Sequence, residues 1–232
     1  MLQKCVNPFG NNSIHKSSDE LLWHKDLKPH VSGEFSIAVV QANSNLEDQS
    51  QVFASPSATY IGVFDGHGGP EASRFVNRHL FALIDKYVEK EGRISTDVIK
   101  KAFSATEESF LRVVKNLIQI RPEIARVGSC CLVGVIYNGE LYVANLGDSR
   151  VVLGKKVVEK GKTRVVAERL SSDHNVSLPE VRKEVEAQHP DDSHIVVYCQ
   201  GGWRIKGIIQ GVMGGVKPGS TPSAGTLRPP LP

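Results

Sequence analysis

Acidic residues stand at several points where an extended segment ends or within a polar loop, and two of these points adjoin glycines. The acidic residues are Glu47-Asp48, Asp65 and Asp148. Asp65 leads directly into Gly66-His67-Gly68-Gly69, so the backbone there can approach a ligand closely. Carboxylate oxygens select hard cations such as Mg²⁺ or Mn²⁺ rather than zinc. A pair of such ions can share a hydroxide that attacks phosphorus, and a neighbouring histidine, here His67, could protonate the leaving alkoxide.

Each of these signals also has a plain structural explanation. An acidic pair in a polar loop, such as Glu47-Asp48, is usually solvated surface, and Asp-Gly is a common turn. His67 alone is compatible with a satisfied structural histidine, and Gly147-Asp148-Ser149 is compatible with a tight hairpin turn. The joint occurrence of these signals in this order is what favours a functional site.

Extended segments are expected next to the first acidic positions. Alternation of apolar and polar residues predicts strands at 35–41 and 60–64. The polar, turn-rich stretch 43–57 between them is expected to be a loop that carries Glu47 and Asp48. Asp65 would then follow directly on the end of the second strand.

A second strand pair is expected before Asp148. The apolar run 130–137 and the shorter run 141–145 are separated by Asn138-Gly139, which is a strong hairpin signal. Asp148 would follow the returning strand of this hairpin. Cys130 and Cys131 begin the first strand, so their side chains should point to opposite faces, as small buried hydrophobic residues rather than as a zinc site or a disulfide.

The remaining elements are helices and further strands. Helical periodicity predicts one helix that begins at Pro70 and a second that Ser95 caps. The other expected elements are a short helix at 19–23, a hairpin of 150–153 with 163–170, a charged helix at 179–189 and two strands within 195–209. Paired helices beside many antiparallel strands favour the α+β class, with helices covering a sheet.

Composition excludes several functions. A net charge of +3 over 232 residues gives no nucleic-acid-binding footprint. No segment approaches the roughly 20 apolar residues of a membrane span, and Leu2 excludes N-myristoylation. No direct membrane insertion is therefore expected. Four cysteines without a C-x-x-C spacing favour a reducing compartment, the cytoplasm or the nucleus.

The acidic positions lie within segments that resemble the type 2C protein phosphatases, the PPM family. These segments are Leu46-Glu47-Asp48, Val63 to Gly69, Gly128 to Cys131 and Ala144 to Arg150. Three further segments, Leu22 to Leu27, Gly33 to Asn43 and His189 to Val197, resemble the plant subgroup linked to control of the plasma-membrane proton pump. The resemblance runs from about Leu21 to Gln210, and its Asp-Gly-His-Gly-Gly element is highly specific.

The resemblance implies an activity and a fold. The activity is the hydrolysis of phosphoserine and phosphothreonine in proteins, assisted by two Mg²⁺ or Mn²⁺ ions. The expected partners are phosphorylated proteins, including a possible membrane-protein substrate in signalling. The family fold is an α/β/β/α sandwich of two antiparallel sheets flanked by helices, which this chain would form incompletely.

The resemblance also assigns roles to residues. Asp65 would bridge both ions, and the Gly66 carbonyl would bind one of them. Glu47 and Asp48 would act largely through metal-bound waters, Asp148 would help to hold a further ion, and His67 would be the general acid. Many relatives grip the substrate phosphate with an arginine at the position of Asn43, so this contact is expected to differ here.

The sequence divides into three parts by this resemblance. Residues 1–20 form a variable N-terminal segment, residues 21–210 the N-terminal part of a phosphatase domain, and residues 211–232 a Gly/Pro-rich tail that is expected to be disordered. The tail stands where relatives continue into further strands and metal-binding aspartates. The alternative function is therefore a catalytically inactive, truncated isoform that acts at most as a partner-binding fragment.

A sandwich without its late strands should leave apolar side chains uncovered. The residues that alternate along the central strands are expected to be the exposed ones, namely Val133, Val135, Leu141, Val143 and Val151.

Overall fold

The computed structural model describes most of the chain between Leu22 and Leu227. The described residues are 22–30, 33–55, 57–199, 201–206, 209–210 and 223–227. For residues 22–27, 209–210 and 223–227 the structure describes the backbone alone. The variable segment predicted for residues 1–20 lies outside the described residues. No helix in the described ranges is long and apolar enough to cross a membrane.

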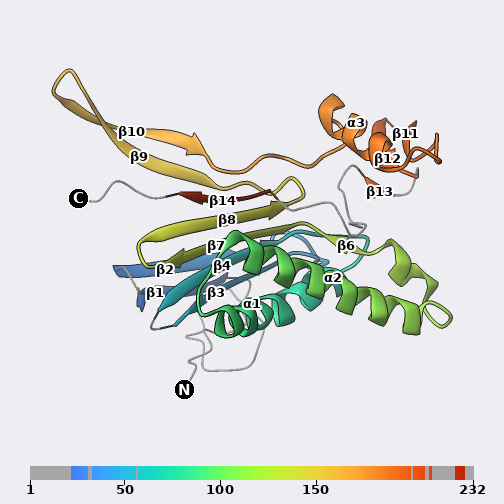
Figure 1. Ribbon diagram of the computed structural model, residues 1–232, viewed down its shortest axis with the longest axis horizontal. Helices are drawn as coiled ribbons and strands as arrows, with labels where there is room; N and C mark the ends of the chain where they lie inside the picture. The colour runs from blue at the N-terminus through green and yellow to red at the C-terminus, as the bar shows by residue number, and fades with distance from the viewer. Residues whose placement is uncertain are drawn as a thin grey trace.

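A five-stranded antiparallel sheet forms the centre of the fold (Figure 1). Its strand order is β14-β8-β7-β4-β3. The strands are β3 (Gln49–Ala54), β4 (Ala58–Phe64), β7 (Cys131–Tyr137), β8 (Glu140–Leu146) and β14 (Ser223–Leu227). The predicted hairpin is confirmed, because Asn138 and Gly139 connect β7 and β8 with φ angles of 49° and 75°. Positive φ at both residues matches the twist of the two strands.

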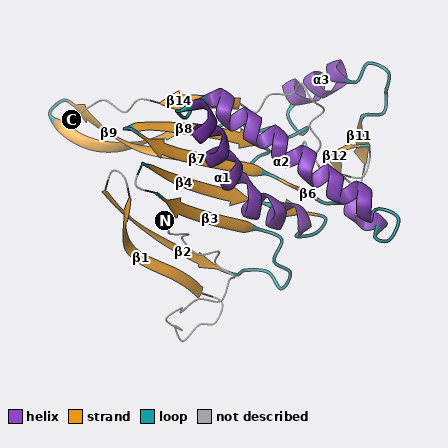
Figure 2. Cartoon of the chain, turned by 60° about the horizontal axis from the view of Figure 1, so that its bottom comes forward, coloured by secondary structure: helices purple, strands orange, loops and turns teal. Residues whose placement is uncertain are grey.

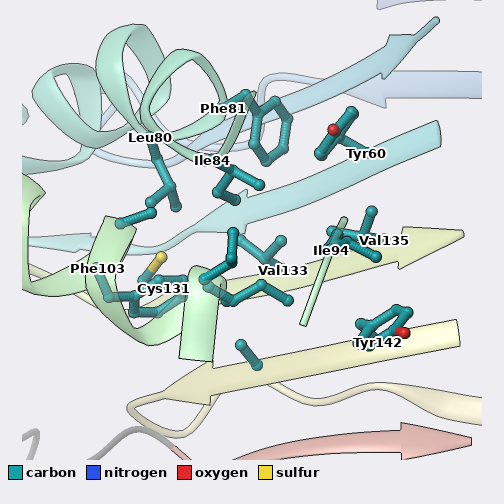
Figure 3. Packing of buried hydrophobic residues seen from close by; sticks show 14 of the residues in the cluster. Tyr60, Leu80, Phe81, Ile84, Ile94, Phe103, Cys131, Val133, Val135 and Tyr142 are labelled. Carbon is teal, nitrogen blue, oxygen red and sulfur yellow. The ribbon is translucent and has the colours of Figure 1, made fainter. Parts of the chain in front are cut away.

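Two helices, α1 (Glu71–Glu91) and α2 (Thr96–Leu117), lie across one face of this sheet (Figure 2). The predicted cap of α2 is confirmed, because the Ser95 side chain accepts a hydrogen bond from the Val98 amide at 3.2 Å. The apolar stripes of the helices pack against alternate residues of the strands (Figure 3). The fully buried members of this core include Phe64, Leu80, Ile84, Ile99, Val133 and Val135.

Val133 and Val135 face the helices, and Val143 lies on the other face of β8 between β7 and β14, which corrects the expected exposure of all three. Val133 and Val135 are only 1% and 0% exposed, and Val143 is 5% exposed. Leu141 and Val151 are half-buried. Val133, Val135 and Val143 were predicted to be exposed because the missing strands were expected to leave one face of the sheet uncovered, but alternation alone does not show which face the helices cover.

Smaller sheets surround the central one. They are the hairpin β1 (Leu22–His30) with β2 (Gly33–Val40), the pair β5 (Gly66–His67) with β6 (Gly128–Ser129), the projecting hairpin β9 (Val152–Glu159) with β10 (Lys162–Arg169), and β11 (Val196–Cys199) with β12 (Gly202–Ile205) and β13 (Ile209–Gln210). A 3-10 helix, Pro122–Arg126, precedes β6. The third helix, α3 (Pro179–Gln188), packs on β11 around a second core that contains Val176, Val181 and Ile195.

Two segments before the tail differ from the sequence prediction. Residues 22–23 belong to β1 rather than to the short helix expected at 19–23, because they pair with Val39 and Val40; residues 19–21 lie outside the described residues. The stretch 43–57 was predicted to be a loop but contains β3. Its backbone pairs with β4 along its whole length, and such pairing outweighs the weak strand preference of its glutamines.

The Gly/Pro-rich tail also differs from its prediction at one point. Residues 223–227 form β14, which pairs with β8 from Ser223 opposite Asn145 to Leu227 opposite Leu141. The edge of β8 offers unpaired amide and carbonyl groups, and backbone hydrogen bonds can be made by almost any extended sequence. The other residues of the segment 211–232 lie outside the described residues.

The class is thus α+β, with antiparallel sheets and helices packed on them, as the sequence predicted.

Candidate metal centre

Asp65 is fixed at the end of β4 by backbone contacts to a distant part of the chain. Its carbonyl oxygen accepts a hydrogen bond from the Cys130 amide at 2.8 Å. The next two residues form β5 and pair with β6, with Gly66 opposite Ser129 and His67 opposite Gly128. The segment from Asp65 to His67 is therefore held rigidly against the start of β7.

Gly66 lets the loop with Glu47 and Asp48 come close to Asp65. A Cβ at Gly66 would lie 2.3 Å from the carbonyl oxygen of Glu47, so no larger residue fits without displacing this backbone. The hydroxyl of Ser73, in the first turn of α1, donates to the same Glu47 carbonyl and lies 3.1 Å from the Pro70 carbonyl. The start of α1 thus fastens the acidic loop beside the strand end.

The carboxylates around Asp65 raise its pKa. Desolvation by the surrounding protein, followed by the charges of Asp48 and Asp148, raises the pKa of Asp65 to about 6, and Glu47 adds to the effect. The Asp65 side chain nevertheless stays open to solvent. The structure therefore brings together all the carboxylates that the sequence analysis singled out, and the charged groups that act on Asp65 are all acidic.

His67 lies beside this acidic cluster. Burial lowers the pKa of His67 below its usual range, although the charges of Glu47 and Asp148 oppose that shift. Its Nε2 atom is buried and has no hydrogen-bond partner among the described residues. The ring packs closely on β6, since a Cβ at Gly128 would lie only 2.3 Å from that atom. An unpartnered ring nitrogen next to carboxylates is suited to exchange a proton with a ligand.

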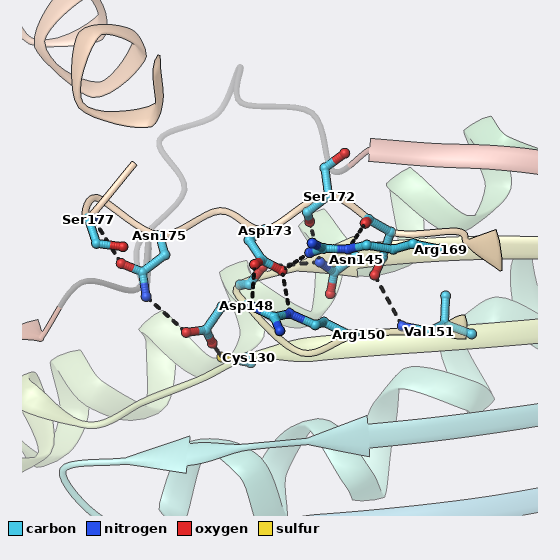
Figure 4. Close-up of polar contacts among 12 residues, drawn as sticks. Cys130, Asn145, Asp148, Arg150, Val151, Arg169, Ser172, Asp173, Asn175 and Ser177 are labelled. Carbon is cyan, nitrogen blue, oxygen red and sulfur yellow. Dashed lines mark hydrogen bonds and ion pairs between the residues drawn. The ribbon is translucent and has the colours of Figure 1, made fainter. Parts of the chain in front are cut away.

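Asp148 is held from the far side by a residue that the sequence analysis did not single out. The Asn175 amide donates from Nδ2 to Oδ2 of Asp148 at 2.9 Å (Figure 4). The amide of Ser177 donates to Oδ1 of Asn175 at 2.9 Å, which fixes the orientation of the Asn175 side chain. No local pattern marks Asn175, because it follows Asp148 at a separation of 27 residues.

The segment before Asn175 is fastened to the turn at Asp148. Nδ2 of the buried Asn145 donates to the carbonyl oxygens of Gly147 and Ser172, at 3.0 and 2.7 Å. Arg150 pairs with Asp173 at 2.8 Å rather than with Asp148 (Figure 4). Arg150 thus makes its direct ion pair with Asp173, although the charge of Asp148 also acts on it.

A thiol, that of Cys130, lies beside the carboxylates of Asp65 and Asp148. One oxygen each of Asp65 and Asp148 and the sulfur of Cys130 all lie within 4.8 Å of one another. An acidic cluster of this kind fits a bound cation, because no basic side chain of the described residues is among the charges that act on Asp65. Glu47, Asp48, Asp65 and Asp148 could supply oxygen ligands directly or through water, and so could the carbonyl of Gly66.

Asn43 lies apart from these contacts. It is exposed in the loop after β2, and its carbonyl oxygen accepts a hydrogen bond from the Gln41 side chain at 2.8 Å.

The fold is an antiparallel sheet with two helices on one face, and it carries an acidic centre at its strand ends. The family model described as Protein phosphatase 2C matches residues 34–209. The match covers most of the chain and includes every carboxylate of the candidate centre. The chain therefore belongs to the protein phosphatase 2C family.

Plant relatives are closely similar in sequence. Probable protein phosphatase 2C 63 of Arabidopsis thaliana is 65% identical over 211 residues, which cover 90% of this chain and 54% of the relative. Probable protein phosphatase 2C 78 of Oryza sativa subsp. japonica is 58% identical over 208 residues, which cover 90% of this chain and 53% of the relative. The chain thus spans about half the length of these curated relatives.

Solved structures support the fold. A serine-threonine phosphatase 2C from Toxoplasma gondii matches 80% of this chain and 70% of its own, with a TM-score of 0.60 and 16% identity. A sex-determining protein of C. elegans matches 80% of this chain and 46% of its own, with a TM-score of 0.60 and 19% identity. At these identities the likeness concerns the fold alone.

Proposed function

We propose that the chain is part of a phosphatase that hydrolyses phosphoserine and phosphothreonine in proteins with the help of two Mg²⁺ or Mn²⁺ ions. The observation that carries the proposal is the group of carboxylates around Asp65, which the small Gly66 allows the Glu47 loop to join. Membership of the protein phosphatase 2C family agrees with it. The ions would supply an activated water for attack and would offset the charge of the phosphoryl group.

The residues of this chain would then have separate tasks. Asp65 and the Gly66 carbonyl would hold the ions directly, and Glu47 and Asp48 would orient the waters around them. Asp148, which is held by Asn175, would help to bind a further ion at the side of the centre. The exposure of the Asp65 side chain leaves room for a phosphoprotein substrate to reach the centre from solvent.

His67 would deliver the proton to the departing serine or threonine oxygen. Burial lowers the pKa of His67, so a proton on the ring would be held loosely and could be given up readily. The charges of Glu47 and Asp148 oppose this effect and favour the protonated imidazole. A phosphorylated substrate would strengthen the protonated form further by its own negative charge.

Phosphate release from a phosphothreonine peptide tests this proposal. We expect Mn²⁺-dependent release by the full chain, and a loss of at least about 100-fold in the Asp65→Asn variant, because an electrostatic contact to the reacting group is typically worth that much. Asp191→Asn, at an exposed aspartate in the turn after α3, is the matched control and should keep full activity. Mn²⁺ binding without hydrolysis would refute the enzyme and favour a partner-binding fragment.

We further propose that the protein acts in the cytoplasm or the nucleus, where a phosphorylated membrane protein would still be accessible as a substrate. The buried free thiols of Cys130 and Cys131 support a reducing compartment. Imaging of the tagged chain would test the location, and accumulation in the secretory pathway would contradict it.

A further inference from the structure

A buried thiol faces the acidic centre. Cys130 is 1% exposed, and its sulfur lies 3.4 Å from Oδ1 of Asp148 (Figure 4). The ligand atoms of Asp65, Cys130 and Asp148 lie within 4.8 Å of one another. The three residues come from separate parts of the chain, at the end of β4, the start of β7 and the turn after β8.

The backbone fixes the direction of this thiol. The Cys130 amide is bound to the Asp65 carbonyl, and a Cβ at Gly147 would lie 2.6 Å from the Cys130 sulfur. The missing side chain at Gly147, whose φ is 110°, therefore provides the space that the sulfur occupies. Cys131 points to the other side and belongs to the core beneath the helices (Figure 3).

Asp148 presents one oxygen to the thiol and keeps the other engaged. Asn175 donates to Oδ2, which leaves Oδ1 directed at the sulfur of Cys130. A hydrogen bond from outside the ligand group, such as this one, orients a metal ligand before the ion arrives.

The separation of two of the ligand atoms matches the requirement of a tetrahedral ion. With a zinc–sulfur bond of about 2.3 Å and a zinc–oxygen bond of about 2.0 Å, the sulfur and oxygen ligands of one ion lie about 3.5 Å apart. The observed separation between the Cys130 sulfur and Oδ1 of Asp148 is 3.4 Å. A fourth position would remain for water on the solvent side of Asp65, whose side chain is exposed.

We propose that Asp65, Cys130 and Asp148 form a binding site for a thiophilic divalent cation such as Zn²⁺. Hard ions such as Mg²⁺ bind through oxygen and gain little from a thiol, whereas Zn²⁺ and Co²⁺ bind sulfur well. Binding forms the metal–sulfur bond, breaks the S–H bond and releases one proton to solvent.

Such an ion would compete with Mg²⁺ or Mn²⁺, because it takes Asp65 and Asp148 from the oxygen-rich centre. This consequence rests on the proposed phosphatase function, and it makes the thiophilic ion an inhibitor. The binding itself does not depend on that function and can be measured without a substrate.

Titration of the full chain with Co²⁺ tests the site, because a cobalt–thiolate bond gives a charge-transfer absorption in the near ultraviolet. We expect this band in the wild-type protein, its loss in Cys130→Ala and its retention in Cys131→Ala, a variant matched in the atom it removes. In calorimetry, Cys130→Ala should weaken Zn²⁺ binding by at least about 10-fold, which is the smallest effect expected even for a residue that only supports a metal ligand. The same variant should bind Mn²⁺ within about twofold of the wild-type affinity, because Mn²⁺ prefers oxygen ligands.

Several outcomes would overturn the site. They are no band in the wild type, a band that persists in Cys130→Ala, and a band that disappears in Cys131→Ala. If Cys130→Ala fails to fold by circular dichroism, the wild-type band and its weakening in Asp148→Asn decide the question. A chain that shows the band but releases no phosphate refutes only the phosphatase function, whereas an active chain without the band refutes only the thiophilic site.

Discussion

At the scale of single residues, the candidate centre concentrates carboxylates around Asp65, and their charges raise the pKa of Asp65. The pKa of Asp65 is raised from 3.8 to about 6, mainly by desolvation and then by Asp48 and Asp148. The folded protein thus binds a proton at this carboxylate more tightly than the unfolded chain does. Asp65 therefore reduces stability when it is charged and no metal is bound.

The sign of this effect gives a pH-dependent prediction for Asp65→Asn. In EDTA, the free energy of unfolding of the wild type should fall as the pH rises from 3.8 to about 6, since the folded state loses its favoured proton in this window. The shift corresponds to about 3 kcal/mol in full. Screening of this solvent-exposed carboxylate reduces the expected gain of the variant at neutral pH to about 1 kcal/mol.

Urea unfolding in EDTA at neutral and at acidic pH measures the Asp65→Asn effect. Asp191→Asn is the control for removing an exposed carboxylate and should change little. Adding Mn²⁺ should make the wild type more stable than Asp65→Asn, because the ion stabilises the folded protein that binds it more tightly. A variant that is less stable than the wild type in EDTA at neutral pH would show that Asp65 is already neutralised.

The sequence predicted the carboxylates of the centre but not the residues that hold them. Asp65 and Asp148 stand next to glycines, and such local patterns can be seen in a sequence. Asn175 and Ser73 act through contacts to partners 27 and 26 residues away, so only the folded chain shows them. For Cys130 and Cys131 the alternation correctly placed the side chains on opposite faces, but it did not show which of them faces the acidic centre.

At the scale of elements, the sequence predicted correctly those turns and helix ends whose backbone conformation depends on one or two neighbouring residues. Asn138-Gly139 predicted the turn between β7 and β8, and Ser95 predicted the start of α2. β3 was missed because its glutamines and serine resemble a loop, and its partner β4 supplies the hydrogen bonds that make it a strand. β14 was missed for the same reason, since its partner β8 is distant in the sequence.

The cap of α2 can be tested by Ser95→Ala. Ser95 has an extended backbone, with φ −155° and ψ 165°, and its hydroxyl accepts the Val98 amide that would otherwise lack an intrahelical partner. Its loss should lower the free energy of unfolding by about 1 kcal/mol. Ser109→Ala removes the same hydroxyl within α2, where it donates to the Ala105 carbonyl, and should be nearly neutral because alanine favours helix interiors. Equal losses in both variants would contradict a capping role for Ser95.

At the scale of the whole molecule, the two faces of the central sheet differ in cover. The helix side holds Tyr60, Phe64, Val133 and Val135 in a tight core. The opposite side of β4 carries Ile61 and Val63, which are 41% and 43% exposed although they lie in the interior of a strand. This difference follows from helices α1 and α2 lying on one face only (Figures 1 and 2). Exposed apolar strand surfaces of this kind promote association between chains.

Val63→Thr and Val135→Thr compare the two faces with one change of side chain. Val63 is 43% exposed, so its substitution should cost less than about 0.5 kcal/mol, as for most surface changes. Val135 is 0% exposed, and burying a hydroxyl there without a partner should cost about 1–3 kcal/mol. Val63→Thr should also reduce the binding of hydrophobic dyes and the light scattering of concentrated protein, because it removes apolar area from the exposed face. If Val63→Thr destabilises the protein as much as Val135→Thr does, another segment must cover this face of the sheet in solution.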